Sequence, residues 1–119
     1  MKRNKQNIDW DNLGFNAHET KSMYIAKFDS NGKCQNKGLV PYGDIKLSPA
    51  ATVLNYGQGV FEGMKAYETS KKHVVLFRLD ENAKRFSNSC LRLCMPKIHN
   101  EMFVSAVKET VLDNLEYMP

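Results

Sequence analysis

The segment 54–67 (LNYGQGVFEGMKAY) constrains the fold most, because it places three glycines among aromatic and charged residues. Glycine inside a regular helix or strand is destabilising by roughly 0.5–1 kcal/mol relative to alanine. Gly57, Gly59 and Gly63 therefore predict unusual backbone dihedrals or a close approach of the backbone to another group. The simpler alternative is a tight turn between two strands.

Two hairpins are predicted on either side of this segment. Residues 23–28 (MYIAKF) are rich in aromatic and β-branched side chains, and the Asn31-Gly32 pair that follows favours a two-residue hairpin turn. We expect a strand, a turn and a second strand to about Leu39. Residues 64–67 and 74–77 predict the second hairpin, joined by a polar loop.

A further short strand is predicted at residues 44–47. Pro41 and Pro49 bracket this segment, and the residue before a proline is pushed toward extended conformations. Loops are expected on both sides of the strand.

Two helices are predicted after the second hairpin. Asp80 is the expected N-cap of the first, which should continue to Pro96 with an apolar stripe of Ala83, Phe86, Cys90 and Leu93. Asn100 is the expected cap of the second, whose apolar face comprises Phe103, Val104, Val107, Val111 and Leu115. These elements predict an α+β fold, mainly an antiparallel sheet followed by two C-terminal helices.

Length and charge indicate one folded domain without a strongly charged binding surface. The 119 residues carry a net charge of +4, and the signs interleave except at residues 1–6. We expect residues 1–9 to form a solvated basic tail and residues 10–119 to form the domain. No helix-turn-helix, RNP-like or zinc-finger spacing is present, which argues against a nucleic-acid partner.

Membrane insertion, secretion and metal binding are not predicted. No uninterrupted apolar run exceeds four residues, and the three cysteines include no CxxC pair. Cys90 and Cys94 are expected to be buried thiols in a reducing compartment. Because Asp9 and Asp11 come too early for a transit peptide, the chain as written is expected in the cytoplasm. A plastid or mitochondrial location would require further sequence ahead of Met1.

Several stretches, in order along the chain, resemble the branched-chain amino acid aminotransferases, and especially the plant-like members of that family. These are fold-type IV enzymes that use pyridoxal phosphate. The resemblance extends from about Trp10 onward and is carried by residues 40–48 (VPYGDIKLS), 54–67, 76–83 (LFRLDENA), 92–96 (RLCMP) and 103–112 (FVSAVKETVL).

The resemblance implies a function for the complete enzyme. That enzyme would transfer the amino group of leucine, isoleucine or valine to 2-oxoglutarate through pyridoxal 5′-phosphate. This chain would be its N-terminal domain. The family's Schiff-base lysine lies in a second, C-terminal domain that would begin beyond Pro119, so we expect no turnover by this chain alone. Family members are homodimers, which implies a homodimer or pairing with a full-length subunit.

The resemblance also implies the site residues. Arg85 matches the arginine that holds the cofactor phosphate, although on helix pattern alone a surface salt bridge is the simpler interpretation. Tyr56 and Phe61 match aromatic walls of the substrate pocket. Lys65 matches a basic position near the substrate, and Phe15 matches a pocket aromatic from the N-terminal segment. No catalytic residue and no metal ligand is assigned, and Glu62 is expected only to fix the turn.

Departures from the family pattern support an alternative function. They occur at Lys21, Ser22, Glu68, Leu79, Ser89 and Cys90. The alternative is a truncated, non-catalytic paralogue that acts only as an interaction partner or has no function. Aminodeoxychorismate lyase or D-amino acid aminotransferase chemistry is a further alternative. A dinucleotide fingerprint fails, because Glu62 occupies the place of its third glycine.

Overall fold

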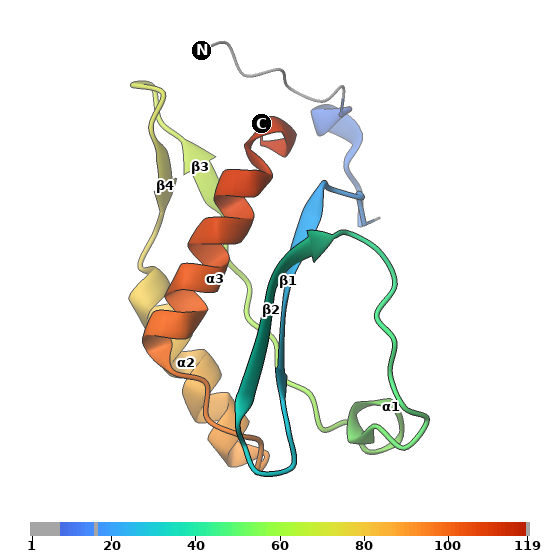
Figure 1. The fold of residues 1–119 in the computed structure, drawn as a ribbon. Coiled ribbons are helices and arrows are strands. Elements are labelled where there is room, and N and C mark those ends of the chain that lie inside the picture. Colours follow the sequence, from blue (N-terminus) through green and yellow to red (C-terminus); the bar gives the residue numbers. More distant parts are fainter. Residues whose placement is uncertain (1–7, 16, 119) are drawn as a thin grey trace.

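The fold is a small α+β domain, seen in a computed structural model that describes residues 8–15 and 17–118. Across these residues it contains two antiparallel sheets of two strands each and three α-helices (Figure 1). The predicted α+β class is confirmed. The strands do not join into one sheet, however, and each hairpin stands by itself. Most of the predicted basic tail lies outside the described residues.

The first predicted hairpin is confirmed as β1 (Ser22–Phe28) and β2 (Cys34–Pro41). The expected two-residue turn is wrong, because five residues, 29–33, connect the strands. Asp29 stabilises this longer loop, since its Oδ1 accepts the backbone N–H groups of Asn31 and Lys33, both at 2.9 Å. The predicted Asn-Gly pair lies inside the loop, with Gly32 at φ +75°.

The predicted strand at residues 44–47 is wrong. These residues are exposed and form no strand, and α1 (Thr52–Tyr56) follows them. The backbone N–H of Tyr42 donates to the Lys21 carbonyl at 3.1 Å, just beyond the end of β2. An extended segment becomes a strand only when a neighbour supplies hydrogen-bond partners, and no described strand pairs with this one.

The second predicted hairpin is confirmed, with shorter strands. β3 (Ala66–Glu68) pairs with β4 (Val74–Leu76) in antiparallel register from Ala66 opposite Leu76 to Glu68 opposite Val74. Between α1 and β3 the chain runs without regular structure. The glycine-rich segment is therefore the end of a short helix, an irregular connection and the start of β3, and not a tight turn between strands.

Both predicted helices are present, but their caps differ from the predictions. α2 (Leu79–Arg92) begins before Asp80, and its N-cap is Arg78 in the left-handed region at φ +49°. Asp80 lies in the first turn, where a negative charge still complements the helix dipole. The helix ends ahead of Pro96. The N-cap position of α3 (Asn100–Asp113) is His99, one residue before the expected cap, and its side chain makes no capping hydrogen bond.

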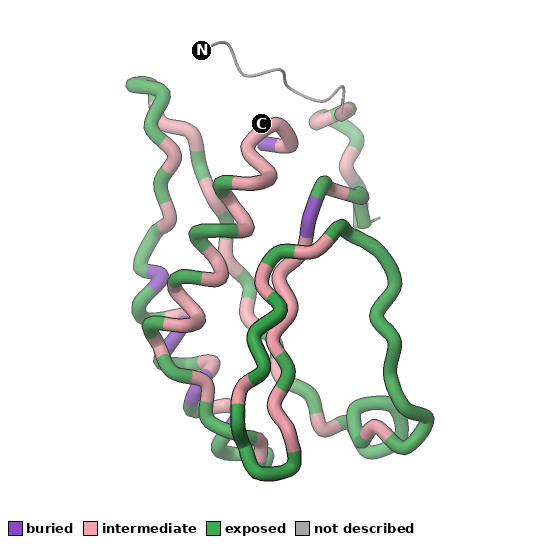
Figure 2. Tube along the Cα trace, in the orientation of Figure 1, coloured by how far each residue is buried: buried purple, intermediate pink, exposed green. Residues whose placement is uncertain are grey.

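The two helices pack together and form the small core. The ring centroids of Phe86 in α2 and Phe103 in α3 lie 5.0 Å apart. α3 also contacts β1 and β2 (Figure 1). Burial concentrates on α2, as the purple segments of Figure 2 show. The buried apolar residues among those described are Leu79, Ala83, Cys90 and Met118.

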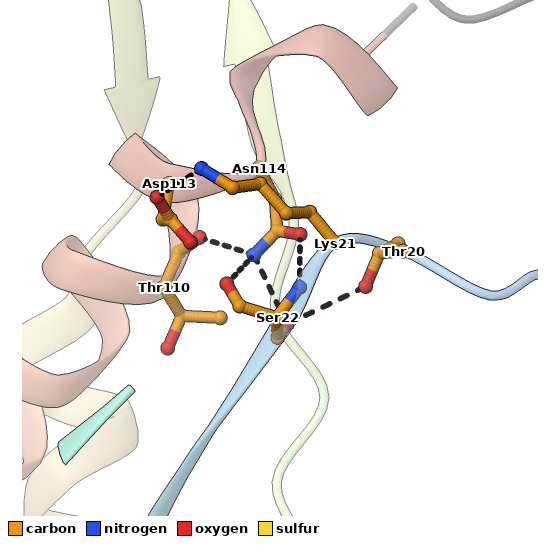
Figure 3. Close-up of polar contacts among 6 residues, drawn as sticks. All are labelled: Thr20, Lys21, Ser22, Thr110, Asp113 and Asn114. Carbon is orange, nitrogen blue, oxygen red and sulfur yellow. Dashed lines mark hydrogen bonds and ion pairs between the residues drawn. The ribbon is translucent and has the colours of Figure 1, made fainter. Parts of the chain in front are cut away.

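The end of α3 is tied to the start of β1 by a polar cluster (Figure 3). Asn114 and Asp113 bond to Ser22 and Lys21, respectively. This cluster fixes the first hairpin against the helices. Within the described residues, no helix is both long and apolar enough to cross a bilayer.

Candidate functional site

The predicted phosphate ligand, Arg85, forms a bidentate ion pair with Glu62 of the glycine-rich segment. Its Nε lies 2.6 Å from Glu62 Oε1, and its Nη2 lies 2.7 Å from Oε2. The two partners differ sharply in burial, because the Glu62 side chain is 5% exposed and the Arg85 side chain is 68% exposed. The guanidinium therefore lies between a buried carboxylate and solvent.

Asn82, one helical turn before Arg85, holds the same segment. Its Nδ2 donates to Glu62 Oε2 at 2.8 Å and to the Gly63 carbonyl at 3.3 Å. Residues three apart on a helix share a face, so α2 presents Asn82 and Arg85 together. These contacts fasten the glycine-rich segment to the helix.

The ion pair shifts the pKa values of both Glu62 and Arg85. The hydrogen bond from Arg85 is the main cause that lowers the pKa of Glu62; desolvation opposes it, and the hydrogen bond from Asn82 makes a smaller contribution in the same direction as Arg85. The same hydrogen bond raises the pKa of Arg85. Both groups are therefore charged at neutral pH.

Lys65 lies in an open groove beside this pair. The groove has a volume of about 440 Å³ and is lined by Gly63, Met64, Lys65, Tyr67, Phe77 and Asn82. Asn82 is common to the groove and to the Glu62 contacts. Asn82 therefore borders both the groove that Lys65 lines and the carboxylate that Arg85 binds.

The three predicted pocket aromatics are not gathered into a wall. Phe15, Tyr56 and Phe61 are 109%, 84% and 90% exposed, respectively. Tyr56 is the last residue of α1, and Phe61 immediately precedes Glu62. Such exposed rings do not pack against the described part of the chain, so a pocket built from them needs a further surface.

Two features of the site escaped sequence reasoning. Asn82 was not predicted as a site residue, although its spacing from Arg85 places both on one helical face. Glu62 was expected only to fix the turn. It does fasten the glycine-rich segment, but it does so through Arg85 and Asn82, whose positions opposite Glu62 depend on tertiary structure.

The predicted burial of both helix cysteines is half correct. Cys90 is buried, and burial raises the pKa of its thiol, whereas Cys94 is exposed. Cys94 lies beyond the end of α2 and has φ +55°, so it is not on the helical face that carries Cys90. In the part of the chain that the structure describes, no three His, Cys, Asp or Glu side chains are grouped to hold a metal ion.

A larger apolar groove lies away from the predicted residues. It has a volume of about 560 Å³ and is lined by residues of β4, α2 and α3, including Leu76, Val104 and Val111. None of the residues predicted for cofactor or substrate binding lines it.

Sequence comparisons identify relatives of the chain. It is 47% identical over 112 residues to chloroplastic branched-chain-amino-acid aminotransferase 5 of Arabidopsis thaliana, which covers 94% of this chain and 27% of that protein. It is 48% identical over 112 residues to a chloroplastic branched-chain amino acid aminotransferase 2 of Humulus lupulus, covering 94% of this chain and 28% of the relative. The resemblance to branched-chain amino acid aminotransferases is confirmed.

A mitochondrial branched-chain amino acid aminotransferase 1 of Humulus lupulus is 44% identical over 113 residues, covering 95% of this chain and 29% of the relative. The chain therefore spans less than a third of the length of the aminotransferases that it matches. No family model matches the chain.

Proposed function

We propose that this chain is the N-terminal domain of a fold-type IV branched-chain amino acid transaminase. It would hold the phosphate of pyridoxal 5′-phosphate and form part of the substrate pocket, while the Schiff-base lysine comes from outside these 119 residues. The observation that carries the proposal is the exposed, fixed guanidinium of Arg85, at the position where the resemblance expects the phosphate ligand. Identity of 44–48% along almost the whole chain supports it.

The residues present fit a phosphate. A guanidinium has five N–H donors, and Arg85 directs two of them at Glu62, so three remain for another acceptor. Its planar fork suits phosphate oxygens, and its charge does not titrate in the physiological range. When bound, pyridoxal phosphate would supply the electron sink of the reaction.

The other predicted residues have roles at the substrate side of this proposal. Lys65, in the groove beside Asn82, would offer a positive charge to a substrate carboxylate. Tyr56, Phe61 and Phe15 would provide rigid apolar walls for branched aliphatic side chains. Because all three rings are exposed, we propose that a second domain or a neighbouring subunit of a dimer completes the pocket.

The names of the relatives also bear on the cellular compartment of the protein. Two of the three relatives described above are named as chloroplastic and one as mitochondrial. We propose a plastid or mitochondrial location in preference to the cytoplasm. Localisation of the native protein by immunogold labelling would test this choice.

The test of the function uses a chimera that joins this chain to the C-terminal part of the Arabidopsis relative. Arg85→Ala should weaken retention of pyridoxal phosphate by roughly 10- to 150-fold, since a hydrogen bond between charged groups contributes about 1.5–3 kcal/mol. Arg92→Ala, at the exposed end of α2, is the control and should leave retention unchanged. Equal affinity in the Arg85 variant and the parent would mean that the phosphate site lies elsewhere.

A non-catalytic interaction partner is the second candidate. The large exposed apolar side chains favour it, for example Phe77, Leu91 and Leu112 at 78%, 54% and 66% exposure, respectively. The departures at Lys21 and Ser22 are accommodated, since both residues have polar partners on α3 or immediately after it. The mass of the native polypeptide and its co-purification with an aminotransferase distinguish the transaminase domain from the non-catalytic partner. A native polypeptide of 13.6 kDa that co-purifies with a full-length aminotransferase would support the interaction role.

A further inference from the structure

We infer that Glu62 is a positioning residue, which orients the guanidinium of Arg85 so that its outward edge is presented to a phosphate group. This inference rests on the proposed function, because it assigns the phosphate to Arg85. It adds that the buried acid acts through the arginine and makes no contact with the phosphate itself.

The carboxylate of Glu62 is the fixed member of the ion pair. Burying a charge is costly unless it is paired and hydrogen-bonded. The Glu62 side chain is only 5% exposed, and its oxygens accept bonds from Arg85 and from the Asn82 amide. Asn82 also donates to the neighbouring Gly63 carbonyl. A movement of the Glu62 carboxylate would therefore break its bonds to Asn82 and to Arg85.

The carboxylate of Glu62 binds one edge of the Arg85 guanidinium and leaves the other edge open. Glu62 takes one N–H from Nε and one from Nη2, so it occupies the side of the guanidinium. Nη1 and the second hydrogen of Nη2 are left for another acceptor. A phosphate can bind these groups while the ion pair stays intact.

The ion pair pre-organises the Arg85 side chain for a ligand. An arginine on a helix surface that is 68% exposed would otherwise sample many rotamers, and a ligand would have to order it on binding. The ion pair orders the side chain in advance. Glu62 should therefore strengthen phosphate binding, although it carries a negative charge. If it instead competed with the phosphate for Arg85, its removal would tighten binding.

The experiment titrates the ¹⁵N-labelled 119-residue chain with pyridoxine 5′-phosphate and, separately, with pyridoxine. Neither probe has an aldehyde, so neither forms Schiff bases with surface lysines. The Arg85 Nε–Hε resonance reports the ion pair and the ligand together. In the wild-type chain we expect the phosphorylated probe to shift this resonance and the unphosphorylated probe to leave it in place.

The variants then separate positioning from general stability. Glu62→Gln should weaken binding of pyridoxine 5′-phosphate about tenfold and should leave any binding of pyridoxine unchanged. Arg85→Ala and the double variant lack the Nε–Hε reporter, so their binding is followed from the backbone amide resonances. Arg85→Ala should lose at least as much, and the double variant should lose no more than Arg85→Ala alone, because Glu62 acts through Arg85. Glu19→Gln, in an exposed coil segment, is the matched control and should bind like the wild type. If Glu62→Gln does not fold, Glu62→Asp replaces it, since its shorter side chain also breaks the bidentate geometry.

The possible failures are distinguishable. Loss of binding in Arg85→Ala, with unchanged or tighter binding in Glu62→Gln, would overturn the positioning role and leave the proposed phosphate site intact. Additional loss in the double variant beyond Arg85→Ala would also overturn it. Absence of any phosphate-dependent shift at Arg85 in the wild-type chain would overturn both the positioning role and the phosphate site.

Discussion

The side chain of Asn114, just after α3, is hydrogen-bonded to both the backbone and the hydroxyl group of Ser22, at the start of β1 (Figure 3). Asn114 Oδ1 accepts the Ser22 N–H at 3.0 Å. Its Nδ2 donates to the Ser22 carbonyl at 3.1 Å, to Ser22 Oγ at 2.9 Å and to the Thr110 carbonyl at 2.7 Å. One amide thus joins segments 92 residues apart in the sequence.

Asn114→Ala should destabilise the chain by about 1–3 kcal/mol, because it leaves the backbone N–H of the buried Ser22 without its acceptor. Urea unfolding followed by circular dichroism would measure the change. Asn88→Ala, at an exposed position of α2, is the control and should stay within about 0.5 kcal/mol of the wild type. An equal effect of the two substitutions would show that the cluster does not hold β1 to α3.

The Glu62–Arg85 pair should make stability depend on pH in the acidic range. The pKa of Glu62 is lowered in the folded chain, so the pair contributes fully above the unfolded value of about 4.3. That contribution is lost as pH falls through the lower folded value. The difference in unfolding free energy between wild type and Glu62→Gln should therefore shrink from about pH 6 to about pH 3.

Arg85→Gln is the companion variant for this measurement, because it removes the cation that lowers the pKa of Glu62. Stability of this variant should fall less steeply with acid than that of the wild type. A difference between wild type and Glu62→Gln that is constant across the range would mean that the pair is not formed in solution.

Gly57 and Gly63 should respond differently to alanine. Gly57 ends α1 at φ +63°, a left-handed conformation that costs an L-residue roughly 1–2 kcal/mol. Gly63 has no positive φ, and a Cβ there would meet no atom within 4 Å. We expect Gly57→Ala to lower the melting temperature and Gly63→Ala to leave it nearly unchanged. The reverse order would contradict the described backbone of this segment.

The chain alone should not catalyse transamination, because the Schiff-base lysine is proposed to come from outside these 119 residues. Purified chain incubated with pyridoxal phosphate, leucine and 2-oxoglutarate should form no glutamate above background. The full-length Arabidopsis relative serves as the positive control. Glutamate formed by the chain at a rate above that of pyridoxal phosphate alone would show that a lysine within it can serve.

Local patterns predicted the elements whose hydrogen bonds or packing partners lie close in sequence. The apolar stripe that includes Ala83 and Cys90 predicted α2, and the segment MYIAKF predicted β1. Exact ends were less predictable, since Asp80 has the chemistry of an N-cap and yet the chain begins the helix earlier, at Leu79.

Strand pairs and hydrogen bonds between segments that are distant in sequence were decided by the tertiary structure. The segment 44–47 has the sequence character of a strand, but no described strand pairs with it, so it remains irregular. Arg85 was predicted as a phosphate ligand from family resemblance alone, whereas its bond to Glu62, 23 residues away, required the folded chain.

The sequence by itself therefore determined the α+β class, the two hairpins, the two long helices and the resemblance to branched-chain amino acid aminotransferases. These follow from side-chain periods of two or about 3.6 residues and from matching stretches along one chain. Only the tertiary structure decided that Glu62 is buried against Arg85 and that Asn114 holds Ser22. The physical reason is that burial and hydrogen-bond pairing between distant segments depend on how the elements pack, which no local spacing specifies.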